Sequence, residues 1–118
     1  MDKLDMIFDY QNKLDTDIIE KRSLGSIGME EWIQRETLAM MSELAELIDE
    51  VNFKWWKNKK PVDIELVRGE LVDILHFFVS MCLKTGMDAE MLFEKYLEKN
   101  QENFDRQYGR SEKKGYEL

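Results

Sequence analysis

The stretch ELVDILHFFVSMCL, residues 70–83, decides the fold class of this chain. Ten of the thirteen residues after Glu70 are apolar, and the exceptions are Asp73, His76 and Ser80. A helix that is apolar nearly all round is a buried helix. At about 100° per residue, Glu70, Asp73 and Ser80 fall within roughly a quarter of its circumference, with His76 at the margin. We therefore expect a buried helix that carries one polar strip.

Three further helical stretches accompany this one. Apolar residues at spacings of three and four predict helices over residues 3–22 and 29–52, separated by a break at residues 24–28. Asp63 and Asp88 suit the N-caps of helices over residues 63–84 and 88–106, and Thr85-Gly86 suits the stop between them. The short connections predict antiparallel neighbours. We predict an all-α four-helix bundle in a single domain, residues 1–118.

The composition excludes several classes of protein. The formal net charge is -8, and an acidic surface repels a phosphate backbone, so we expect no nucleic-acid partner. One proline and six glycines provide few turns for a β-rich fold. The single cysteine, Cys82, forms no internal disulfide and suits a core position in a reducing compartment. With no signal peptide and no apolar run long enough for a bilayer, we expect a cytoplasmic protein without a membrane partner.

Two acidic pairs are candidate metal ligands. Glu43 and Glu46, like Glu70 and Asp73, are three residues apart, so each pair lies on one side of its helix and can share an ion. Two antiparallel helices would join them into a four-oxygen cage, which favours magnesium or manganese over zinc. An oxygen-activating dimetal bundle would need two Glu-x-x-His motifs, and the only histidine is six residues after Glu70.

Other charged and aromatic residues allow two interpretations each. Glu36 and Glu50 continue the seven-residue spacing of Glu43, and we expect them to be solvated or at most to contact the metal ligands. Basic residues gather at 54–60 and 99–114, where they clamp a polyphosphate or keep loops in water. Trp55 and Trp56 are adjacent and cannot both face a core. One of them stacks on a base or on a partner subunit.

Three motifs in order resemble a known family. They are Glu43–Lys57 (ELAELIDEVNFKWWK), Glu70–Phe77 (ELVDILHF) and Lys99–Gln107 with the pattern Lys-Asn-x-x-Asn-x-x-Arg-Gln. Together with Gln11 in Phe-Asp-Tyr-Gln, they resemble the dimeric dUTPase family. This family belongs to the all-α nucleoside triphosphate pyrophosphatase superfamily, which includes the MazG-like enzymes.

The resemblance implies a hydrolase of nucleotide metabolism that converts dUTP to dUMP and pyrophosphate. Its metal ligands would be Glu43, Glu46, Glu70 and Asp73, holding Mg²⁺ with Mn²⁺ as a possible substitute. Glu43 or Glu46 would help to deprotonate the attacking water.

The resemblance also implies a set of substrate contacts. Gln11 would read the base through its amide, and His76 and Phe77 would lie against the base and sugar. The phosphate oxygens would be held by Lys54, Lys99, Asn103, Arg106 and Tyr116. The family works as a dimer with residues of both subunits in each site, so we expect a homodimer or a dimer of dimers.

Two alternatives stay open at this point. One is a pyrophosphatase on the same scaffold that acts on dCTP or on a modified nucleotide. The other is a non-catalytic helical interaction module whose acidic strip is a partner-binding surface.

Overall fold

The computed structural model describes residues 1–118 and contains four α-helices and no β-strand. The predicted all-α, four-helix class is confirmed, and each helix end lies within three residues of its predicted position. None of the helices combines the length and the apolar character that crossing a membrane requires. The helices are α1 (Lys3–Lys21), α2 (Met29–Asp49), α3 (Ile64–Lys84) and α4 (Ala89–Gln107).

Local side-chain chemistry explains where three of the helices begin. Asp2 and Asp5 form a reciprocal cap at the start of α1, in which each carboxylate accepts from the other residue's backbone N–H. Asp63 accepts from two backbone amides in the first turn of α3, and Asp88 accepts from one in α4. Both predicted N-caps are therefore confirmed. Gly86 follows α3 with φ of +76°, a left-handed conformation that suits glycine and confirms the predicted stop.

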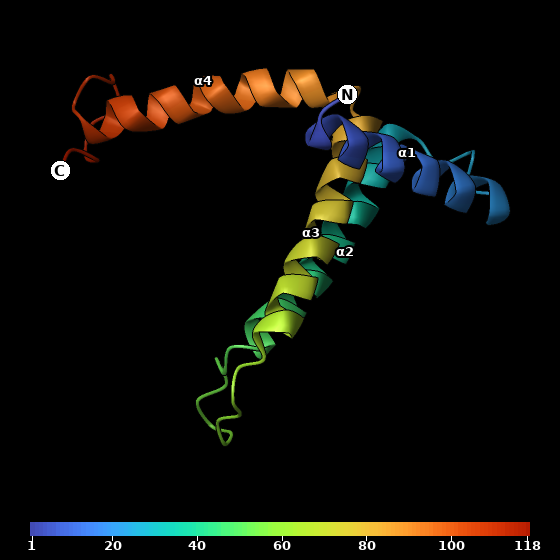
Figure 1. Cartoon of the computed structure of the whole chain (residues 1–118), viewed down its shortest axis with the longest axis horizontal. Coiled ribbons are helices and arrows are strands. Elements are labelled where there is room, and N and C mark those ends of the chain that lie inside the picture. The colour runs from blue at the N-terminus through green and yellow to red at the C-terminus, as the bar shows by residue number, and fades with distance from the viewer. The chain divides into compact units, whose positions relative to one another are not determined.

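The chain divides into two compact units, Met1–Gly86 and Met87–Leu118. In the first unit, α3 is the central helix and packs against both α1 and α2. Figure 1 shows α2 and α3 side by side and antiparallel, with their connecting loop at the end remote from α1. Asn52 closes this loop, because its side-chain amide donates to the carbonyl of Lys60 and accepts from its N–H, both at 2.9 Å.

The second unit consists of α4 and the segment that follows it. Ser111 is buried, and its hydroxyl donates to Oε1 of Glu102 at 2.5 Å. Arg106 Nε donates to the same oxygen at 3.1 Å. The hydrogen bond from Ser111, with help from Arg106, lowers the pKa of the Glu102 carboxyl. These contacts hold the C-terminal segment against its own helix.

The first unit encloses few apolar side chains. Phe8, Val79 and Cys82 are buried, which confirms Cys82 as a core residue. The prediction that α3 is buried all round is wrong for the isolated chain, because only α1 and α2 pack on it within this unit. Much of the apolar surface of α2 and α3 is therefore exposed, including Leu38, Met41, Leu44, Ile48, Leu71, Val72, Leu75 and Phe78.

Candidate functional site

Three of the four predicted metal ligands come together between α2 and α3. Glu43, Glu46 and Glu70 each place a carboxylate oxygen within 4.8 Å of the other two. The antiparallel packing of the two helices brings these distant residues to one place. Asp73 lies one turn further along α3, is exposed and stands outside this cluster.

The three carboxylates form an electrostatically unfavourable group by themselves. Oε2 of Glu43 and Oε2 of Glu70 are buried and have no hydrogen-bond partner. Burial, together with the neighbouring carboxylates of Glu43 and Glu46, raises the pKa of Glu70 to about 7. A cation would satisfy the unpartnered oxygens and relieve the repulsion. The all-oxygen donor set fits Mg²⁺ or Mn²⁺.

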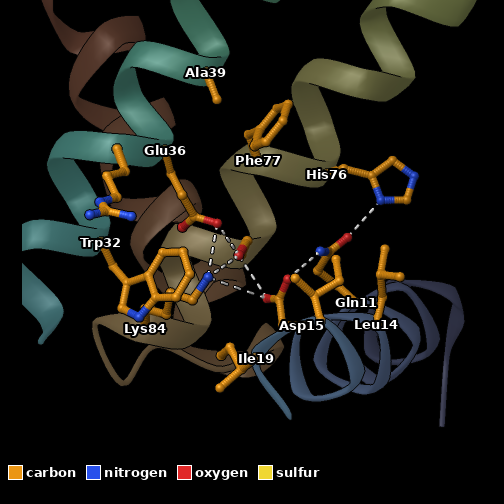
Figure 2. Close-up of a pocket in the computed structure, with 13 residues that line it drawn as sticks. Gln11, Leu14, Asp15, Ile19, Trp32, Glu36, Ala39, His76, Phe77 and Lys84 are labelled. Atoms are coloured by element: carbon orange, nitrogen blue, oxygen red, sulfur yellow. Dashed lines mark hydrogen bonds and ion pairs between the residues drawn. The ribbon is translucent and has the colours of Figure 1, made fainter. Parts of the chain in front are cut away.

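A pocket of about 480 Å³ lies among α1, α2 and α3. Figure 2 shows its side chains converging from the three helices. Both apolar and polar side chains line it, and the combination of apolar walls with converging polar groups is typical of a small-molecule site. The apolar lining is Leu14, Ile18, Ile19, Trp32, Ala39 and Phe77, and the polar lining is Gln11, Asp15, Arg35, Glu36, His76, Ser80 and Lys84.

Gln11 and His76, both predicted to contact the base, are hydrogen-bonded to each other in this pocket. Gln11 is buried, and its Nε2 donates to Oδ1 of Asp15 at 2.9 Å. A carboxylate only accepts, so this bond fixes the orientation of the Gln11 amide. Oε1 of Gln11 then faces Nδ1 of His76 at 2.6 Å, which places the hydrogen on Nδ1 (Figure 2). In the neutral ring, Nε2 of His76 is left as an acceptor.

Glu36 is buried, so the expectation that it is solvated is wrong. Only 7% of the residue is exposed, because the packing of α2 on α3 turns it toward Ser80 and Lys84. Its Oε1 accepts from Nζ of Lys84 at 2.9 Å and lies 2.5 Å from Oγ of Ser80. The same hydroxyl lies 2.7 Å from Oδ2 of Asp15. Nζ of Lys84 also sits 3.9 Å from the centre of the Trp32 ring.

This buried network contains residues that sequence reasoning missed. Asp15, Trp32 and Lys84 were assigned no role, although each lines the pocket. The usable signal was spacing: Asp15 is four residues after Gln11, and Lys84 is four residues after Ser80, so each pair shares a helix face. A charged residue one turn beyond the polar strip of an apolar helix belongs with that strip.

The loop between α2 and α3 carries two other predicted substrate residues. Nζ of Lys54 pairs with Asp49 at 3.2 Å. Trp55 and Trp56 are 86% and 62% exposed, and their rings meet edge to face at 4.7 Å between centres. This confirms the prediction that Trp55 and Trp56 do not both face a core. The loop lies at the end of the α2/α3 pair remote from α1, so the structure does not bring Trp56 to the pocket (Figure 1).

The remaining predicted phosphate contacts belong to the second unit and gather near the end of α4. The Arg106 guanidinium lies 5.4 Å from the centre of the Tyr116 ring. Its Nη1 atom donates to Oδ1 of Asn103 at 3.5 Å. Lys99 is exposed, about two turns earlier on the same helix. Within this unit, Asn103, Arg106 and Tyr116 therefore form one group.

Comparison with known proteins gives a family match and two relatives. The sequence model of a family described as dUTPase matches residues 3–91, which include α1, α2 and α3. A dCTP pyrophosphatase of Enterobacteria phage T4 is 34% identical over 87 residues, covering 62% of this chain and 51% of the relative. A dCTP pyrophosphatase of Enterobacteria phage LZ5 is 34% identical over 74 residues, covering 63% of this chain and 43% of the relative. The chain thus spans about half the length of these relatives. No solved structure is significantly similar to it.

Proposed function

This chain belongs to the dUTPase family, and on that premise we propose that it is a magnesium-dependent pyrophosphohydrolase of pyrimidine deoxynucleoside triphosphates. It would cleave the anhydride bond between the α- and β-phosphates with water, giving the nucleoside monophosphate and pyrophosphate. The observation that carries the proposal is the cluster of Glu43, Glu46 and Glu70 next to the pocket. Ala39, which lines that pocket, is one turn before Glu43 on α2.

Two bases are candidates for the substrate. The family description and the amide of Gln11 support dUTP, because an amide can both donate to and accept from uracil. The two curated relatives are dCTP pyrophosphatases and support dCTP. Both substrates share the phosphate chemistry, so the choice between them depends on the polar groups of the pocket.

Glu43, Glu46 and Glu70 would hold the magnesium ions, or manganese in their place. Asp73 is three residues from Glu70 on α3 and exposed, so its side chain can turn toward the same ions. When bound, the metal would neutralise charge on the phosphate oxygens and make water easier to deprotonate.

Other side chains of the protein would accept a proton, contact the base and sugar, and bind the phosphates. The carboxylate of Glu43 or Glu46 would accept the proton of the attacking water. Gln11 and His76 would contact the base, and Phe77 would lie against the sugar, where a bulky ring disfavours a 2′-hydroxyl. The phosphate oxygens would be held by Lys54, Lys99, Asn103, Arg106 and Tyr116, which donate charge-assisted or neutral hydrogen bonds.

We also propose that the protein works as a homodimer or a dimer of dimers. Leu44 and Ile48 on α2 are 45% and 47% exposed, and they belong to a hollow apolar strip with Met41 and Val51. Trp56 is a large exposed aromatic on the adjoining loop. Contiguous apolar patches of this kind on a soluble protein mark contact surfaces. A second copy would bury them, and Trp56 of one subunit could then lie against the base bound to the other.

A thermal-shift measurement with magnesium, combined with a substrate screen, tests the proposed function. Magnesium should raise the melting temperature of the wild type and much less that of Glu70→Ala. Pyrophosphate release should then be faster with dCTP or dUTP than with the ribonucleotides and purine deoxynucleotides. Absence of a magnesium response would favour the non-catalytic module. Equal rates on all triphosphates would contradict a pyrimidine pocket.

A further inference from the structure

One buried oxygen in the pocket has no donor. The Oε2 atom of Glu36 is shielded from solvent and has no hydrogen-bond partner, whereas Oε1 has two. An unsatisfied buried carboxylate oxygen is costly, and such a group calls for a partner. It belongs to a side chain that lines the pocket and is more than nine-tenths buried.

The nearest donor side chains are engaged in other contacts. Ser80 has one hydroxyl hydrogen, and two carboxylate oxygens already compete for it, at 2.5 and 2.7 Å. Nζ of Lys84 contacts Glu36 Oε1 and Ser80 Oγ, and its remaining side faces the Trp32 ring. Arg35 lines the pocket, but its guanidinium pairs with Glu31 at 3.4 Å. None of these donors contacts Oε2 of Glu36, so this oxygen is free to accept from a molecule in the pocket.

The charge of the network around Glu36 also calls for a hydrogen-bond donor as the partner. Asp15 and Glu36 contribute two carboxylates and Lys84 one ammonium group, so this network has an excess of hydrogen-bond acceptors. The edge of cytosine carries an N4 amino group that donates, whereas uracil carries the O4 acceptor in that place. A carboxylate would accept from the amine and repel the oxygen. Glu and Asp are the side chains that accept from cytosine N4 in nucleic-acid recognition.

We infer that Glu36, held by Ser80 and Lys84, accepts a hydrogen bond from the amino group of cytosine and makes the pocket selective for dCTP over dUTP. This inference rests on the proposed function, and it assigns the choice of base to Glu36 and not to Gln11 alone. Gln11 keeps a free N–H and His76 a free Nε2 acceptor for the rest of the base edge.

The spacing along α2 agrees with this assignment. Glu36 and the metal-ligand candidate Glu43 are seven residues apart on one helix, which is about 10 Å along its axis. Ser80 and Asp73 have the same separation on α3. A nucleotide can span this length, with its phosphates at the cluster of Glu43, Glu46 and Glu70 and its base at Glu36.

Nucleotide binding by Glu36→Gln tests the inference without depending on catalysis. Gln keeps the shape of Glu36 but carries an NH₂ group, so it can donate a hydrogen bond to uracil O4. Calorimetry with dCMP and dUMP should show that the wild type binds dCMP at least about tenfold more tightly. The dCMP:dUMP affinity ratio should fall at least about tenfold in Glu36→Gln. Glu30→Gln, an exposed change in the first turn of the same helix, should keep the wild-type ratio.

The outcomes separate this inference from the proposed function. It is overturned if the wild type binds dUMP as well as dCMP, if it binds neither, or if Glu36→Gln keeps the wild-type ratio. Selective dCMP binding without pyrophosphate release from dCTP would support Glu36 as the base reader and contradict the proposed reaction. If Glu36→Gln lacks the helical circular dichroism of the wild type, the wild type carries the test with N4,N4-dimethyl-dCMP, which has no N4 hydrogen to donate. It should bind at least about tenfold more weakly than dCMP, and equal binding would overturn the inference.

Discussion

Nδ1 of His76 lies 2.6 Å from Oε1 of Gln11, so a partly buried hydrogen bond joins α3 to α1 across the pocket. The bond connects the two side chains that sequence reasoning assigned to the base. It also continues through Asp15 and Ser80 to Glu36 and Lys84. Substitutions at one end of this hydrogen-bond network should therefore affect base binding, protein stability or both.

Removing the Gln11 side chain should weaken substrate binding. Gln11→Ala should raise KM for the preferred triphosphate by about tenfold, the cost of one lost hydrogen bond and a loosened His76 ring. Steady-state pyrophosphate release checks this, with the exposed neighbour Asn12→Ala as the matched control. A KM unchanged in Gln11→Ala would remove Gln11 from the base site.

Lys84 should be important for stability. Its Nζ is the cation beside the buried carboxylate of Glu36 and the largely buried carboxylate of Asp15, and its own side chain is 13% exposed. Lys84→Met leaves those carboxylates unpaired, so the free energy of unfolding should fall by about 3 kcal/mol in urea titrations.

Lys21 provides the control for that change. It pairs with Asp17 on the surface of α1, with 75% of its side chain exposed. Lys21→Met should alter the free energy of unfolding by less than about 0.5 kcal/mol. Similar losses in the two variants would mean that the buried network contributes no special stability.

The stability of the metal-free protein should depend on pH through Glu70. Its pKa is raised from 4.5 to about 7 in the folded state, so the folded protein binds the proton more tightly than the unfolded chain. The Glu70 contribution to stability is present below pH 4.5 and is lost as the pH rises through about 7.

Melting temperatures measured in EDTA between those pH values would check this dependence. The decline should be flatter in Glu70→Gln and unchanged in Glu20→Gln, an exposed glutamate on α1. Magnesium should reduce the decline, since the cation replaces the proton in the cluster. An identical pH profile for wild type and Glu70→Gln would contradict a strained carboxylate cluster.

The apolar strip on α2 should hold subunits together. Sedimentation equilibrium should give at least twice the monomer mass of 14.2 kDa. Ile48→Lys places a charge in the strip and should shift the protein toward monomer, whereas Glu30→Lys, on the polar start of the same helix, should not. A wild type that stays monomeric at high concentration would contradict the dimer.

Some features were predictable because they depend on neighbouring residues, or on the simple antiparallel pairing of two consecutive helices. Asp63 and Asp88 identified helix starts through caps that reach only two or three residues ahead. Glu43, Glu46 and Glu70 were predicted as one group because two i, i+3 pairs on antiparallel helices have few ways to meet.

Other features depend on which helix faces cover each other. Glu36 has the same seven-residue spacing as Glu50, and only the packing of α2 against Ser80 and Lys84 distinguishes it as buried. The same holds for Leu71 and Leu75, whose exposure follows from how little of α3 its neighbours cover within the first unit. A one-dimensional pattern contains neither of these contacts.

Pyrophosphate release from dCTP and dUTP, measured with and without magnesium, tests the central claim most directly. The wild type should release pyrophosphate and nucleoside monophosphate in equal amounts, and only with magnesium or manganese present. Glu43→Gln should reduce the rate at least about a hundredfold while keeping its helical content, because both a metal ligand and a candidate base are lost. Release of orthophosphate in place of pyrophosphate, or full activity in EDTA, would contradict a metal-dependent pyrophosphohydrolase.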